Sequence, residues 1–151
     1  MQKILWMVYI ADSLESFFVK GNGIDILEIQ IFRAKKGKNI VTIEEMFYYF
    51  DDKYGDEFNW GIISYGASHF VEELKKEVGD NDPMFQNDIC AVARSYSADD
   101  VLFLVDDEKD TYRIYHLTYS HKEDKFLRFV EMENIEKVKE FLERQFIEEY
   151  L

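Results

Sequence analysis

The chain has 151 residues with 31 acidic and 18 basic side chains, which give a formal net charge of −13. A hydrophobic share of 47%, with 13 Phe and 10 Tyr, excludes a disordered acidic tail, because such tails are poor in aromatic residues. The single Cys excludes a disulfide framework, and the charge argues against nucleic acid as a partner, since phosphates repel a polyanion. Length and the absence of a low-complexity linker predict one globular domain over residues 1–151.

The beginning of the chain differs in charge from the rest. Residues 1–41 carry a net charge of +2, so residues 42–151 carry −15. The apolar run over residues 4–11 is too short to span a bilayer and lacks a small-residue cleavage site, so it predicts a buried helix or strand. Residues 2–20 are expected to be mostly helical, whereas residues 24–36 fit a helix or a strand. A cytoplasmic protein without a membrane partner is expected.

Two helices are predicted between residues 42 and 79. Thr42 and Glu45 have the Thr-x-x-Glu spacing of a capping box, which predicts a helix that ends at Gly55. A second helix is predicted from about residue 68 to residue 78. The apolar positions recur every three or four residues, at Ile43, Met46, Phe47 and Phe50 in the first helix and at Phe70, Val71, Leu74 and Val78 in the second.

The second half of the chain changes to the period of strands. Four short strands are predicted, over residues 89–95, 101–106, 112–119 and 126–132. The polar turn over residues 107–111 joins the second strand to the third, which favours an antiparallel meander. A last helix is predicted from Asn134 to Tyr150. The expected fold is α+β, with N-terminal helices packed on one face of a three- or four-stranded antiparallel sheet and a C-terminal helix.

Catalytic and metal-binding motifs are weak. Ser64 lies in Gly-x-x-Ser-x-Gly, one residue longer than the Gly-x-Ser-x-Gly turn that exposes a hydrolase serine. Metal ligands with paired spacing are also missing among the candidates, which are His69, Cys90, His116 and His121. These observations predict no enzyme, no cofactor and no metal. The alternative is a small hydrolase whose site would draw on Ser64, His69, His116 or Asp99.

Acidic and aromatic residues gather on the first predicted helix, opposite its apolar positions, and on the segments that follow. A tyrosine on a carboxylate-rich face is typical of an interface anchor with a charged rim. Two further acids lie in a polar loop at a sheet end. The predicted partner-binding residues are Glu44, Tyr48, Asp51, Asp52, Asp56, Glu57, Asp99 and Asp100. The alternative is that Tyr48 and Tyr49 pack beneath neighbouring elements.

In size, acidity and α+β pattern, and in the face formed by Glu44, Tyr48, Asp51 and Asp52, the chain resembles the immunity proteins of bacterial toxin–immunity systems. The resemblance rests on general character and on no motif. It implies an acidic inhibitor that neutralises a cognate basic toxin, such as a nuclease, by covering its active cleft. A large net charge suits this role because it steers association with a partner of opposite charge. A dimeric housekeeping or interaction domain, with aromatic residues at its subunit interface, is a further alternative.

Overall fold

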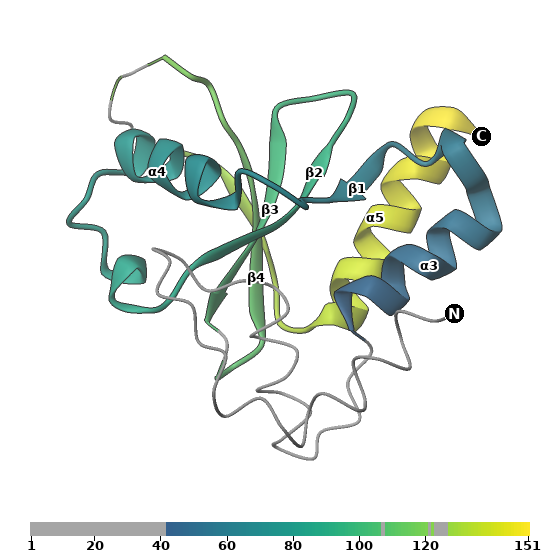
Figure 1. Ribbon diagram of the computed structural model, residues 1–151, viewed down its shortest axis with the longest axis horizontal. Coiled ribbons are helices and arrows are strands. Elements are labelled where there is room, and N and C mark those ends of the chain that lie inside the picture. The colour runs from purple at the N-terminus through teal and green to yellow at the C-terminus, as the bar shows by residue number, and fades with distance from the viewer. Residues whose placement is uncertain (1–41, 107, 121, 123–126) are drawn as a thin grey trace.

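The computed structural model describes residues 42–106, 108–120, 122 and 127–151, which form an α+β fold (Figure 1). Its helices and strands are α3 (Ile43–Tyr54), η2 (Gly55–Glu57), β1 (Trp60–Ile62), α4 (Ala67–Val78), η3 (Pro83–Gln86), β2 (Cys90–Ser95), β3 (Asp100–Asp106), β4 (Thr111–His116), β5 (Phe129–Met132) and α5 (Ile135–Tyr150). The predicted fold class is confirmed. The predictions for residues 2–20, including the apolar run over 4–11, and for residues 24–36 lie outside the described residues.

The strands form one antiparallel sheet in the order β1-β2-β3-β4-β5, so each strand pairs with its neighbours in the sequence. The predicted meander is confirmed, but the sheet has five strands in the described part of the chain instead of three or four. The additional strand is β1, which pairs with β2 through Trp60 and Ser95. A strand of three residues is too short to show an alternating pattern, which is why it was not predicted.

Helices cover both faces of the sheet, which corrects the prediction of one covered face (Figure 1). Leu102 and Leu104 of β3 pack into the core shared with α3 and α5, whereas Val101 and Phe103 pack on the opposite face, where α4 lies. The physical reason lies in β3 itself. Its apolar run has no polar side, so it requires cover on both faces. None of the helices among the described residues has the length and the apolar character that a membrane span requires.

Helix α3 begins and ends as its sequence predicts. The Glu45 N–H donates to Thr42 Oγ1 at 3.1 Å, and the Thr42 N–H donates to the Glu45 carboxylate at 2.8 Å. This capping box satisfies two backbone donors that a helix start otherwise leaves unpaired. Aromatic ring contacts then join α3 to the segment after it and to α5, stacked for Phe50 with Phe58 and tilted for Phe58 with Phe146. The Phe50 and Phe58 centroids lie 4.1 Å apart, and those of Phe58 and Phe146 lie 5.3 Å apart.

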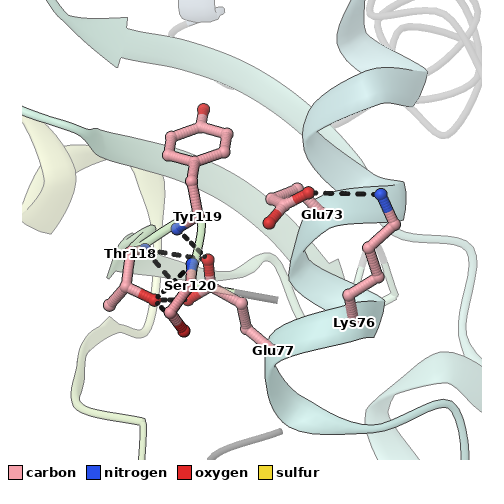
Figure 2. A network of polar contacts seen from close by, with 6 residues as sticks. All are labelled: Glu73, Lys76, Glu77, Thr118, Tyr119 and Ser120. Carbon is pink, nitrogen blue, oxygen red and sulfur yellow. Dashed lines mark hydrogen bonds and ion pairs between the residues drawn. The ribbon is translucent and has the colours of Figure 1, made fainter. Parts of the chain in front are cut away.

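Helix α4 buries two glutamates that the sequence analysis did not expect on its inner face (Figure 2). Leu74 is fully buried as predicted, but Glu73 and Glu77 are only 2% and 1% exposed. The Glu77 carboxylate accepts the backbone N–H groups of Thr118 and Tyr119 at 2.8 and 2.7 Å, and the Thr118 hydroxyl at 3.1 Å. Glu77 therefore anchors the segment that follows β4 onto α4, because its carboxylate oxygens accept hydrogen bonds from the donors of that segment.

Candidate functional site, an acidic and aromatic groove

A groove of about 450 Å³ runs between α3, η2 and the edge strand β1, and we call it the α3–β1 groove. Its polar and exposed lining comes from two stretches of the chain, the continuous segment of α3 and η2 and the distant loop after β2. These residues are Glu44, Tyr48 and Asp51 of α3, Asp56 of η2, and Tyr96 of the loop after β2. The apolar part of the lining is formed by Phe47, Phe58, Trp60 and Ile62. The groove thus combines carboxylates at its rim with aromatic and aliphatic walls.

The chemistry of the α3–β1 groove favours a cation. Asp51 and Asp56 are exposed, so their charges are accessible to a partner. Tyr48 is 58% exposed and Tyr96 is 63% exposed, and both rings line the groove. Carboxylates form charge-assisted hydrogen bonds with Lys and Arg, and the faces of tyrosine rings attract the same cations. The groove therefore offers two kinds of contact to one basic side chain.

Tyr96 reaches the groove because residue 61 is a glycine. A Cβ atom at Gly61 would overlap the end of the Tyr96 ring, so any side chain there would displace the tyrosine. The Tyr96 N–H donates to the Asn59 carbonyl at 2.8 Å, and the Arg94 guanidinium lies 5.5 Å from the ring centroid. Neither Gly61 nor Tyr96 was among the site residues predicted from the sequence. The available signal was the glycine itself, since a glycine within a strand often marks a close approach.

Asp51 and Asp52 occupy the last turn of α3, where a helix disfavours anions. The partial negative charge of the helix C-terminus destabilises a nearby carboxylate by about 0.3–1 kcal/mol. Lys53 is the basic residue of this turn and partly offsets the two acids. Proteins place residues that oppose a local folding preference mainly at functional sites. The position of Asp51 at the groove fits this expectation.

The groove brings together four of the eight residues predicted to bind a partner, namely Glu44, Tyr48, Asp51 and Asp56. Asp52 and Glu57 are exposed but do not line it. Asp99 and Asp100 do not line it: Asp99 ends the loop between β2 and β3, and Asp100 is the first residue of β3. Asp100 Oδ1 is 2.7 Å from His116 Nδ1, so this carboxylate already has a partner within the protein.

The two neighbouring tyrosines of α3 have different environments. Tyr49 is partly buried, and its hydroxyl donates to Glu143 Oε1 of α5 at 2.9 Å. The alternative that these rings pack beneath a neighbouring element therefore describes Tyr49. It does not describe Tyr48, which is 58% exposed and lies at the α3–β1 groove. Tyr48 therefore stays the predicted interface anchor.

Glu143 of α5 accepts hydrogen bonds from three residues of α3. Besides Tyr49, Lys53 Nζ and the Tyr54 hydroxyl donate to Glu143 Oε1 at 2.7 and 2.8 Å. Desolvation opposes ionisation of Glu143, but the hydrogen bonds from Lys53, Tyr54 and Tyr49 outweigh it and lower the pKa of this carboxyl. The hydrogen bond to Glu143 in turn raises the pKa of Lys53. The hydrogen bonds to this carboxylate therefore hold α3 and α5 together.

The residues considered for catalysis, Ser64, His69, His116 and Asp99, form no hydrogen bond with one another in the described structure. Ser64 is exposed in the loop after β1, and His69 is exposed on α4. His116 pairs with Asp100 at the end of β4, and Cys90 is buried at 3% exposure. His121 lies outside the described residues. Across residues 42–106, 108–120, 122 and 127–151, no three His, Cys, Asp or Glu side chains are grouped to hold a metal ion.

Comparison with known proteins gives no match: no protein-family model, no curated protein and no solved structure is similar to the chain. The fold and the groove define the class instead. The described residues form an α+β protein whose α3–β1 groove carries exposed acidic and aromatic side chains.

Proposed function

We propose that the protein binds a basic protein partner through the α3–β1 groove and inhibits it. The expected biological setting is that of a bacterial immunity protein, which acts in the cytoplasm and neutralises a cognate toxin, such as a nuclease, by covering its active cleft. One observation carries the proposal. The groove places the exposed rings of Tyr48 and Tyr96 beside the exposed carboxylates of Asp51 and Asp56.

The proposed division of roles follows from general properties of interfaces. Tyrosines supply large, rigid contact area and are frequent among the residues that dominate binding energy. Carboxylates at the rim increase the rate of association with a cationic partner. The charge of −15 over residues 42–151 adds a long-range field of the same sign. A nuclease cleft suits this surface because it is built to attract phosphate.

The proposal is tested with the proteins encoded by the genes that flank the gene for this chain. Each is expressed with and without the full chain in a bacterial host, and growth is followed. Surface plasmon resonance then measures association with the purified neighbour. We expect one neighbour to arrest growth only in the absence of this chain. Its association rate should fall about tenfold or more between about 0.05 and 0.5 M salt, because salt screens steering charges.

Charge reversal at the groove identifies the surface. Asp51→Lys/Asp56→Lys should slow association about tenfold or more, since it replaces attraction by repulsion at the rim. The matched control is Asp80→Lys/Asp88→Lys, which changes the net charge equally. Both control residues are exposed, and neither lines the groove. Equal effects of the two double variants would contradict the groove as the interface, and lack of binding by every neighbour would contradict the proposed inhibitor.

A further inference from the structure

The edge strand β1 turns a row of backbone groups away from the sheet. In an antiparallel ladder, alternate residues direct their N–H and C=O groups toward the partner strand. The Tyr96 N–H donates to the Asn59 carbonyl, and the Ile63 N–H donates to the Val92 carbonyl at 3.2 Å. The backbone N–H and C=O groups of residues 59, 61 and 63 therefore point toward β2. The backbone groups of Trp60 and Ile62 point the other way, toward an edge where β1 pairs with no strand of the described residues.

The edge of β1 that faces away from β2, which no strand of the described residues pairs with, lies in the α3–β1 groove. All three residues of the strand line the groove, together with the acidic side of α3 and the Tyr96 ring. Natural edge strands are commonly protected by lysine, proline or a covering element, because an exposed edge can template pairing with another chain. β1 has neither lysine nor proline. Its neighbours in the groove, Asp51 and Asp56, attract cationic chains instead.

We propose that the occupant of the groove is an extended basic segment of the partner, which pairs antiparallel with the edge of β1. This inference rests on the proposed function and specifies how the partner is recognised. The segment exchanges backbone hydrogen bonds with Trp60 and Ile62, as in other cases of strand addition. A second copy of this chain is a poor occupant, because both copies carry the same strongly negative charge.

The register determines which side chains of the segment are basic. Residues directly opposite each other in an antiparallel pair point to the same face of the sheet. Trp60 and Ile62 pack into the core on the α3 side, and Gly61 lies beneath Tyr96. The segment residues opposite Trp60 and Ile62 therefore point toward the carboxylates of α3. A lysine or arginine at every second position is the expected pattern, with small or polar residues between.

Synthetic peptides test the pairing with the full chain. The probe is the capped peptide Lys-Thr-Lys-Thr-Lys, and binding is followed by NMR titration of the backbone amides. N-methylation at the lysine amides removes the donors that would face β1, and N-methylation at the threonine amides is the matched control with the same charge. We expect methylation of the lysine amides to weaken binding about tenfold or more, because it removes two hydrogen bonds to β1. Methylation of the threonine amides removes neither bond and should have little effect.

A variant of the protein tests the same contact from the other side. Ile62→Pro removes the N–H that faces the edge and leaves the ladder to β2 intact, because proline is tolerated on an edge strand. It should weaken binding of the unmodified peptide about tenfold, while Ile62→Val, which keeps the N–H, should bind normally. In the unmodified chain, hydrogen exchange of the Ile62 amide should slow when the peptide is added. If Ile62→Pro does not fold, the N-methylated peptides still test strand addition, because they are titrated into the unmodified chain.

The outcomes separate this inference from the proposed function. Equal binding of both N-methylated peptides, or an Ile62 amide that exchanges at the same rate with and without peptide, would overturn strand addition. Charge-dependent binding of a basic neighbour would then still support the proposed function. A Glu-for-Lys peptide that binds as well as the basic one would overturn the expected charge of the segment. A dimer of the chain at micromolar concentration, held through Ile62, would identify a second copy as the occupant and also overturn the inference.

Discussion

The two sides of α3 carry similar residues in opposite situations. Toward α5, Tyr49 and Lys53 donate to the carboxylate of Glu143, so each polar group has a partner within the protein. Toward β1, Tyr48 and Asp51 are exposed and line the groove. Both sides contain a tyrosine and a charged residue on the same helix. The difference comes from the neighbour that each side meets.

This comparison separates side chains that stabilise the fold from side chains available to a partner. A buried or partly buried charge must be paired, so the α5 side contributes to stability and tolerates little change. An exposed carboxylate is solvated and contributes little to stability. We therefore expect substitutions on the α5 side to alter unfolding, and substitutions on the β1 side to alter binding.

The largest effect on stability is expected at the aromatic core beneath α3. Phe50→Ala should lower the free energy of unfolding by about 3–5 kcal/mol, because it opens a cavity in a fully buried stack with Phe58. Tyr48→Ala should change it by no more than about 0.5 kcal/mol, as is usual for an exposed site. Chemical denaturation followed by circular dichroism measures both. A similar loss in the two variants would remove the distinction between the sides of α3.

A smaller loss is expected at the polar contact between α3 and α5. Glu143→Ala should lower the free energy of unfolding by about 1–3 kcal/mol, because three donors lose a charged acceptor. The control is Glu140→Ala on the same helix, which removes the exposed ion pair with Lys137. That change should cost at most about 0.5 kcal/mol. Equal losses would show that the Glu143 contacts contribute no more than a surface pair.

The same contact predicts a difference in acid stability. Because the pKa of Glu143 in the folded protein lies below its ordinary value of 4.5, its contribution is present above that pH. The contribution is lost as the pH falls from 4.5 through the lower folded pKa. Unfolding free energies of the unchanged chain should therefore decline more steeply below pH 4.5 than those of Glu143→Gln. Parallel curves for the two proteins would mean that this carboxyl titrates alike in both states.

The smallest effect, and one of opposite sign, is expected on the β1 side. Asp51→Asn should raise the free energy of unfolding by about 0.3–1 kcal/mol, because it removes an anion from the last turn of α3. Glu45→Gln removes an anion from the first turn and should lower it by a similar amount. The same Asp51→Asn protein should associate more slowly with the basic partner. A decrease in stability for Asp51→Asn would argue that Asp51 has a structural role.

The sequence by itself determined the elements that depend on neighbouring residues. Thr42, Glu45 and Gly55 define the ends of α3, because capping is a contact between residues a few positions apart. The periodic apolar residues of α5 and the hydrophobic run of β3 identify those elements for the same reason. The meander also followed from the polar turn predicted over residues 107–111. The net negative charge of residues 42–151 follows directly from the numbers of acidic and basic residues in the sequence.

Only the tertiary structure decided which of these elements meet. The apolar run of β3 required cover on both faces, but nothing local indicated that α4 provides one of them. Tyr48 and Tyr49 are adjacent in the sequence, and only the position of α5 gives one a partner and leaves the other exposed. The α3–β1 groove likewise depends on packing that joins residues 44–56 to Gly61 and Tyr96. Contacts between distant residues arise from the way whole elements pack, so a pattern read along the chain does not contain them.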